Sequence, residues 1–308
     1  MENIQRVTGH LQTKDTGSRS FLSLVPTGDG GCYFIDEEQE YWRTYRFVEG
    51  ARTYDEAASV QQAHEAAAIF GEFQNLICDL PGPRLHETIA DFHNTPARYR
   101  RFHEAVERDS HGRAGLCRAE IDCALSFEDG AGVLVALQDA GDLPERITHN
   151  DTKLNNVLFD EHGDHAICVI DLDTVMPGLS LYDFGDLVRS ATTSAAEDAT
   201  DIADIGMRLD YFEALAQGYL GTAMNFLTET EIGHLAVAGK VITVETGVRF
   251  LTDYLSGDEY FRVHGPRQNL DRCQAQFALA ASIDRQMADM QRVVAGIVAG
   301  MKRTKQAG

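Results

Sequence analysis

The chain has 308 residues and carries 27 Lys and Arg against 48 Asp and Glu, a formal net charge of −21 at pH 7. So acidic a surface repels the phosphate groups of nucleic acids and of anionic membranes, which argues against both as partners. The length is enough for one large domain or two lobes with a sizeable core.

The cysteine pattern argues against a disulfide-stabilised or zinc-binding protein, because no C-x-x-C pair is present and one cysteine falls in an apolar, strand-like run. The six are Cys32, Cys78, Cys117, Cys123, Cys168 and Cys273. We expect reduced thiols in a cytoplasmic protein. The apolar runs at 131–137 and 293–299 are too short to span a bilayer, and the first residues do not resemble a signal peptide.

The first fifty residues predict one helix and short strands. Ile4, Val7 and Leu11 share one face of a helix over residues 1–12, and residues 21–25 and 32–35 are strand-like. Between these strands lies GDGG at residues 28–31. Its spacing is not G-x-G-x-x-G and no helix follows, so a hairpin turn is favoured over a phosphate-binding loop.

The next part of the chain alternates one aromatic strand with helices. Residues 41–48 are aromatic and strand-like, and residues 54–78 show a helical apolar pattern. A second helical pattern runs over residues 85–106 with a break expected at Pro96, and residues 131–139 predict a buried helix. Together with the strands, these helices predict an α+β fold.

The segment 148–189 carries the chemistry. Residues 149–156, HNDTKLNN, fit H-x-D-x-x-x-x-N, the form of a kinase catalytic loop. In such loops the Asp, here Asp151, accepts the proton of the substrate hydroxyl, and the Asn, here Asn156, holds magnesium. Lys153 stands where protein kinases place a Lys that steadies the transferring phosphoryl group.

A hairpin after this loop predicts a second metal-binding acid. Residues 156–159 and 166–170 are short apolar runs on either side of a turn-forming cluster, DEHGD. If the hairpin folds near His162, residues whose numbers sum to about 325 face each other, so Asn156 lies opposite roughly Val169. Asp171 then lies just beyond, where an amide oxygen and a carboxylate suit a hard cation.

Asp183 is a competing candidate because residues 183–185 spell DFG, the metal-binding motif of protein kinases. It lies 32 residues after Asp151, whereas Asp171 lies 20 after it, within reach of a tight hairpin. We therefore interpret Asp183 as the start of a helix from about residue 184 that braces the catalytic loop. His149 is expected to pack against the loop and hydrogen-bond to it.

The C-terminal half predicts helices at 205–218, 230–255 and 270–301. In the second of these, Glu245, Arg249 and Asp253 are four residues apart on one face. One interpretation is an exposed ladder of ion pairs. The other, which needs the family resemblance described next, is a ligand-binding face.

The whole pattern resembles the aminoglycoside phosphotransferase-like branch of the protein-kinase-like fold. More narrowly, HNDTKLNNVLFD, VIDLDTVMPG and YDFGDLVR resemble the N-acetylhexosamine 1-kinases. The resemblance implies a mostly helical C-terminal lobe, a small β N-terminal lobe, and transfer of a phosphoryl group from ATP with Mg²⁺ to the anomeric hydroxyl of a sugar. Alternatives are an aminoglycoside, choline or homoserine kinase, or a kinase-like protein that binds without turnover.

The resemblance also implies further site residues. In the hexosamine kinases an Arg, and a Tyr eleven residues later, contact the sugar; here these are Arg249 and Tyr260. The strand over residues 41–48 leads towards the hinge between lobes, so Phe47, Val48 and Glu49 are candidates to meet adenine. An ordinary edge strand remains the alternative there.

The resemblance also implies a division into a partial nucleotide lobe with the hinge at 1–50 and a mainly helical catalytic and substrate lobe at 51–308. No glycine-rich hairpin and no strand Lys precede residue 28, since Lys14 lies in a polar segment. We therefore expect the first strands of the nucleotide lobe to be missing, ATP to bind weakly and turnover to be slow or absent. This expectation also predicts an unpaired sheet edge.

Overall fold

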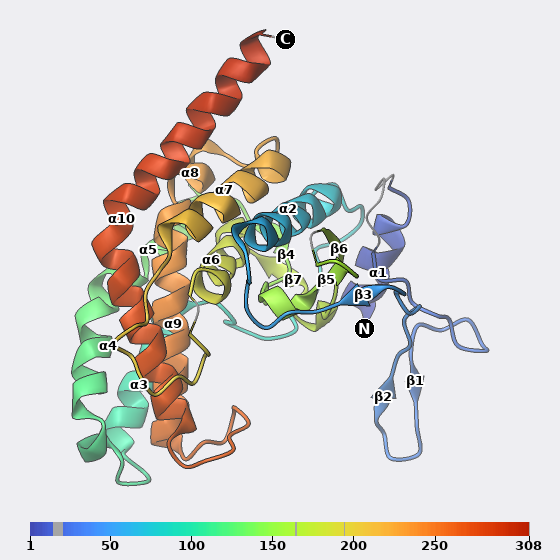
Figure 1. The fold of residues 1–308 in the computed structure, drawn as a ribbon. Helices are drawn as coiled ribbons and strands as arrows, with labels where there is room; N and C mark the ends of the chain where they lie inside the picture. The colour runs from blue at the N-terminus through green and yellow to red at the C-terminus, as the bar shows by residue number, and fades with distance from the viewer. Residues whose placement is uncertain (15–20, 164, 194, 308) are drawn as a thin grey trace.

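The computed structural model describes residues 1–14, 21–163, 165–193 and 195–307. Helices dominate it. They are α1 (Glu2–Leu11), α2 (Val60–Ile77), α3 (Thr95–Arg108), α4 (Arg118–Ala131), α5 (Val133–Asp139), α6 (Ser180–Ala191), α7 (Leu209–Ala223), α8 (Glu229–Gly233), α9 (Leu235–Ser256) and α10 (Gln268–Ala307). Figure 1 shows α10 running beside α9 and extending beyond the other helices at its C-terminal end.

The strands are short and form small antiparallel sheets. They are β1 (Phe34–Ile35), β2 (Tyr41–Trp42), β3 (Ala51–Arg52), β4 (Arg146–Thr148), β5 (Val157–Asp160), β6 (Ala166–Val169) and β7 (Met176–Gly178). β1 pairs with β2, β3 with β5 and β5 with β6, and β4 pairs with β7. Short sheets followed by a helical C-terminal part confirm the α+β class.

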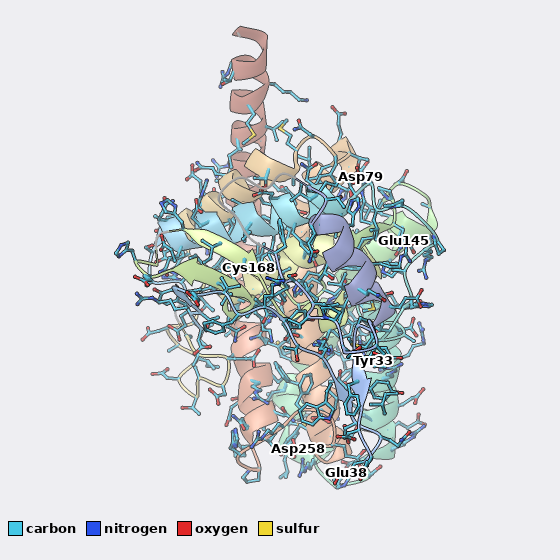
Figure 2. All side chains as sticks on the ribbon, turned by 90° about the vertical axis from the view of Figure 1, so that its right-hand side faces the viewer. Tyr33, Glu38, Asp79, Glu145, Cys168 and Asp258 are labelled. Carbon is cyan, nitrogen blue, oxygen red and sulfur yellow. The ribbon has the colours of Figure 1, made fainter. Side chains whose placement is uncertain are left out.

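The N-terminal strands pair differently from the expected hairpin. A turn does form near residues 28–31, where Gly30 N–H donates to the Thr27 carbonyl at 2.9 Å. The hairpin itself joins β1 to β2 around Asp36, whose carboxylate accepts the Trp42 indole N–H at 2.6 Å. This hairpin projects from the body of the molecule, with Glu38 at its end (Figures 1 and 2). Cys168 of β6, by contrast, is buried.

Two predicted helix boundaries are wrong, the first of them for a local reason. Pro96 does not break a helix over 85–106, because α3 begins at Thr95 and has Pro96 in its first turn, where a missing N–H costs nothing. The Asn94 side chain caps this start by accepting the Ala97 N–H. The predicted helix over 230–255 is divided at His234 into α8 and α9.

The main core lies where α2 packs against α7 and the sheets, and α1 contributes Ile4, Val7 and Leu11 to it. Gly218 of α7 allows close contact between helices, since a Cβ there would lie 2.1 Å from the His64 carbonyl oxygen of α2. A second core joins α3, α4, α9 and α10. No helix within the described ranges combines the length and apolarity needed to cross a membrane.

Candidate active site

The catalytic loop runs from β4 to β5 and ends in a 3-10 turn, Leu154–Asn156. Its second residue, Asn150, has φ 64°, a left-handed conformation that Asn tolerates better than most residues. The Asn150 amide donates to the Thr174 carbonyl at 3.0 Å, which ties this strained residue to the segment before β7.

Asp183 braces this loop, as expected from its place at the start of a helix. Its carboxylate accepts the His149 N–H at 2.9 Å and the Asn150 N–H at 2.7 Å, together with the Gln74 side-chain amide. Burial raises the pKa of Asp183, and the nearby His149 and these N–H donors oppose that rise. Because both oxygens are occupied inside the protein, Asp183 is a poor candidate for holding a metal.

His149 holds the loop against the core, which confirms the packing role expected for it. Its ring makes edge-on contacts with Phe70 and Phe73, at centroid distances of 5.3 and 6.0 Å. Nε2 donates to the Ile170 carbonyl at 2.9 Å, at the end of β6, and Nδ1 faces the Asp151 N–H at 3.3 Å. The loop and the hairpin are therefore joined through one buried ring.

The structure brings together Asp151, Lys153 and Asn156. Lys153 Nζ lies 3.1 Å from Asp151 Oδ2, and the Asn156 amide donates to the same oxygen at 3.1 Å and to the Asp151 carbonyl at 2.7 Å. In the described part of the chain Oδ1 of Asp151 has no hydrogen-bond partner. The carboxylate is thus oriented from one side, with one oxygen available to a substrate hydroxyl.

The hairpin places Asn156 and Asp171 at the same end. Val157 faces Val169, and the Ile170 N–H donates to the Asn156 carbonyl at 2.9 Å. The residue numbers of these pairs sum to 326, where the sequence predicted about 325. Asp171 follows with φ 59° and is exposed to solvent. The predicted register is correct to within one residue: Val169 lies opposite Val157 rather than Asn156, and the pairing shifts between Leu158 and Phe159. Asp171 lies beyond the strand end as inferred.

These side chains fit a magnesium ion that is bound with a nucleotide. The Asn156 amide nitrogen is occupied by Asp151, which leaves its oxygen available, and the Asp171 carboxylate is exposed. Both are the hard oxygen ligands that Mg²⁺ prefers. Within the described ranges no cluster of three His, Cys, Asp or Glu forms a complete cage. A cation here would need phosphate and water oxygens as well.

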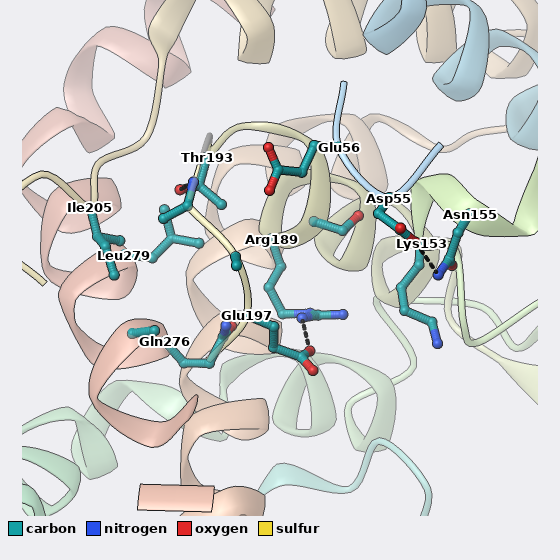
Figure 3. Close-up of a pocket in the computed structure, with 14 residues that line it drawn as sticks. Asp55, Glu56, Lys153, Asn155, Arg189, Thr193, Glu197, Ile205, Gln276 and Leu279 are labelled. Atoms are coloured by element: carbon teal, nitrogen blue, oxygen red, sulfur yellow. Dashed lines mark hydrogen bonds and ion pairs between the residues drawn. The ribbon is translucent and has the colours of Figure 1, made fainter. Parts of the chain in front are cut away.

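A cavity of about 280 Å³ adjoins the loop at Lys153 (Figure 3). Figure 3 shows Arg189 extending into it between Glu197 and Lys153, with Asp55 and Asn155 on the Lys153 side. Arg189 Nη1 donates to Glu197 at 3.2 Å, and the Asn155 amide faces Asp55 at 3.4 Å. The cavity is therefore lined by charged groups of both signs.

Arg189 and Asp186 were missed as site residues by sequence reasoning. Arg189 Nε donates to Asp186 Oδ1 at 2.8 Å, and both side chains are buried. Burial alone would raise the pKa of Asp186, but Arg189, with His93 and Lys153, holds it below its usual value. The available signal was their spacing, three residues apart and one turn after Asp183 on the same helix.

Arg249 and Tyr260 lie together in a second cavity, of about 250 Å³, that Arg98 and Arg101 also line. The Arg249 guanidinium carbon is 5.9 Å from the Tyr260 ring centroid and 5.5 Å from that of Phe261. The Asp253 carboxylate holds the Tyr260 segment by accepting its N–H at 2.8 Å. Helix α9 and the loop after it thus place the Arg249 guanidinium among aromatic rings, in a cavity that two arginines of α3 also line.

The alternative of an exposed ion-pair ladder on this face is wrong. Glu245 is fully buried and accepts from His93 Nδ1 at 2.8 Å and from the Thr95 hydroxyl at 2.6 Å. His93 Nε2 in turn lies 3.1 Å from the Asn150 carbonyl oxygen of the catalytic loop. The helical spacing identified the face correctly, but the segment around α3 covers it and takes Glu245 out of solvent.

The candidate hinge residues lie apart from these cavities. Phe47 is 87% exposed, and Glu49 is also exposed, whereas Val48 packs partly against the main core. None of the three lines the cavity next to Lys153. They lead directly into β3, which pairs with β5 of the catalytic hairpin.

Comparisons with known proteins identify the family and the fold. A model of the phosphotransferase enzyme family (APH) matches residues 25–223. An aminoglycoside phosphotransferase from Alicyclobacillus acidocaldarius aligns with TM-score 0.60 and 16% identity, over 96% of this chain and 83% of that one. A microcompartment-associated aminopropanol kinase gives TM-score 0.55 and 15% identity, over 94% and 82%.

A third solved structure, a spectinomycin phosphotransferase in complex with ADP and spectinomycin, gives TM-score 0.56 and 12% identity, over 93% of this chain and 82% of that one. At such identities the structures establish a shared kinase-like fold and nothing finer. The family match covers well over half of the chain. The chain therefore belongs to the phosphotransferase enzyme family and is a small-molecule kinase.

Proposed function

We propose that this kinase transfers the γ-phosphoryl group of ATP to a hydroxyl group of a small molecule, with Asp151 as the base. The observation that carries the proposal is the convergence of Lys153 and Asn156 on one oxygen of Asp151. This arrangement orients the carboxylate and leaves its other oxygen available for the attacking hydroxyl. Positioning and electrostatic stabilisation account for most of phosphoryl-transfer catalysis.

Asn156 and Asp171 would hold Mg²⁺ against the phosphates, where the ion neutralises charge that develops during transfer. Lys153 would steady the transferring group. We further propose that residues 1–50 contribute the nucleotide lobe, with Phe47, Val48 and Glu49 at its hinge, and that residues 51–308 form the catalytic and acceptor lobe. All six cysteines are free, which supports action in the reducing cytoplasm.

The acceptor we propose is the anomeric hydroxyl of an N-acetylhexosamine. Arg249 and Tyr260, which the sequence resemblance pairs at the sugar, do lie in one cavity with Phe261. A guanidinium can donate to ring hydroxyls and to an acetyl oxygen, while aromatic rings cover the apolar face of a sugar. An aminoglycoside, an amino alcohol such as choline, and homoserine are the competing acceptors.

The test is a phosphate-transfer screen over N-acetylglucosamine, N-acetylgalactosamine, an aminoglycoside, choline and homoserine. We expect the two hexosamines to be preferred. For the better of them, Arg249→Ala and Tyr260→Phe should raise KM about tenfold and leave KM for ATP nearly unchanged, because each removes a contact to one substrate only. Arg108→Ala, at an exposed pair with Glu104, is the control.

Three outcomes would contradict the proposal. Preference for choline or homoserine would exclude a sugar acceptor. An equal loss for sugar and ATP in the Arg249 variant would show that this side chain supports the fold rather than the acceptor. Nucleotide binding without transfer to any acceptor would favour the non-catalytic alternative.

A further inference from the structure

His93 connects two parts of the molecule that are distant in sequence. Its ring is buried, and its two nitrogens contact Glu245 of α9, at 2.8 Å, and the Asn150 carbonyl oxygen, at 3.1 Å. The ring also packs against Tyr182 of α6, at a centroid distance of 4.9 Å. A single imidazole therefore lies between the acceptor-side helix and the residue that precedes Asp151.

The two partners of this ring are both hydrogen-bond acceptors. A backbone carbonyl cannot donate, and Glu245 already accepts the Thr95 hydroxyl on its other oxygen. Burial alone would raise the pKa of Glu245, but His93, then Arg249 and Thr95, hold it below its usual value. A ring that donates from Nδ1 to the Glu245 carboxylate and from Nε2 to the Asn150 carbonyl gives each of these two acceptors its own donor.

The Asn150 carbonyl is where a fixed backbone matters most for Asp151. Asn150 has a left-handed backbone, φ 64°, which costs less for Asn than for most residues but still depends on surroundings that hold it. Its carbonyl shares a rigid peptide plane with the Asp151 N–H. Holding the carbonyl oxygen therefore sets the orientation of that plane and the direction in which the Asp151 side chain leaves it.

The His93–Glu245 pair is also connected to Arg249, which lines the second cavity. Glu245 lies one helical turn before Arg249 on α9, and Phe92, the neighbour of His93, lies 5.0 Å from the Arg249 guanidinium carbon. Phe92 and His93 are themselves in ring contact, at 4.7 Å. The cation proposed to bind the acceptor and the loop that carries the base thus share one buried support.

We propose that His93 is a positioning residue for phosphoryl transfer, which fixes the Asn150 peptide and hence the Asp151 carboxylate, and that its bond to Glu245 ties this position to the helix that carries Arg249. The proposal rests on the assignment of Asp151 as the base. His93 need not touch either substrate, so its loss should lower kcat and leave KM for ATP unchanged.

The experiment compares His93→Leu, His93→Gln and Tyr99→Phe in the full chain. Tyr99 is the matched control, because its buried hydroxyl also donates to a backbone carbonyl, that of Ala124 at 2.9 Å, away from the catalytic loop. We expect His93→Leu to lower kcat about 100-fold. His93→Gln keeps one donor for the Asn150 carbonyl and should recover at least tenfold of that loss, whereas Tyr99→Phe should stay within about twofold of wild type.

A readout that does not depend on turnover separates this proposal from the proposed function. Amide hydrogen exchange of residues 149–156 should be faster in His93→Leu than in wild type or Tyr99→Phe. If the wild type transfers phosphate to no acceptor but this difference is seen, positioning stands and the function fails. Unchanged exchange in His93→Leu would overturn the positioning role. So would a loss of kcat that is equal in the Leu and Gln variants and follows their melting temperatures. If His93→Leu does not fold, His93→Gln is compared with wild type and Tyr99→Phe. A smaller loss of kcat with faster exchange of residues 149–156 is then expected, and the absence of both would overturn the role.

Discussion

Two carboxylates of the site, Asp151 and Asp183, differ in what their oxygen atoms contact. Both oxygens of Asp183 accept N–H groups from inside the protein, and its side chain is completely buried. Asp151 has one oxygen oriented by Lys153 and Asn156 and the other without a protein partner. At the scale of single residues, this contrast in hydrogen bonding favours a structural role for Asp183 and supports the catalytic role proposed for Asp151.

Asp151→Asn should lower kcat by about 100- to 10,000-fold, because the amide keeps the shape of the side chain but cannot take up a proton. The free energy of unfolding should change by less than about 1 kcal/mol, since the side chain is partly exposed and its contacts can be made by an amide. Steady-state kinetics and urea unfolding on the same preparation check both parts. Near-normal kcat would remove Asp151 from the role of base.

At the scale of elements, two connections assemble the site. The β5–β6 hairpin returns the chain so that Asp171 lies near Asn156, and the first turn of α6 inserts Asp183 beneath the catalytic loop. The surroundings of each acid therefore follow from the element that carries it. The end of a hairpin is open to solvent and to a ligand, whereas the start of a buried helix is covered by α2 and the loop.

Asp171→Ala and Asp183→Ala should consequently lose different properties, the first ligand binding and the second stability. The first should weaken binding of the magnesium–nucleotide complex by tenfold or more, about 1.4 kcal/mol, with a small effect on folding. The second leaves buried N–H groups without an acceptor and should lower the free energy of unfolding by about 2–5 kcal/mol. Calorimetric titration with Mg²⁺ and ATP, and chemical unfolding, distinguish them. Metal binding lost only in the Asp183 variant would reverse our assignment.

At the scale of the whole molecule, the buried His93–Glu245 pair joins the second core to the catalytic loop, which packs on the main core. Glu245 lies on α9, whose flanking residues Val244 and Val248 belong to the core shared with α3, α4 and α10. Such a pair contributes stability only while the carboxyl group is ionised. It therefore couples the integrity of the site to pH.

Glu245→Gln should be less stable than wild type by about 1–3 kcal/mol at pH 7, because the buried His93 and Thr95 donors lose their charged acceptor. The folded pKa of Glu245 lies below the ordinary value of 4.5, so its contribution is present above about pH 4.5 and is lost as pH falls through the folded pKa. Urea unfolding at pH 7 and below pH 4, on either side of the sequence pI of 4.8, should show the gap shrinking. An equal gap at both values would contradict this account.

Local sequence patterns determined the catalytic hairpin. Its two apolar runs and short turn predicted the pairing to within one residue, which was enough to infer that Asn156 and Asp171 are neighbours. Asp183 could be assigned as a bracing acid for a similar reason, because residue 183 follows a strand break and starts a helix. The magnesium and sugar roles of these and other residues remain predictions.

The tertiary structure alone decided which surface each helix face meets. The spacing of four residues predicted that Glu245 and Arg249 lie on one face of α9. Nothing in the local sequence indicates that His93, 152 residues earlier, covers Glu245, or that Arg249 lines a cavity. The start of α3 likewise depended on the Asn94 cap rather than on apolar periodicity. Periodicity reports only the chain's own geometry, whereas burial and pairing depend on residues that the fold brings from elsewhere.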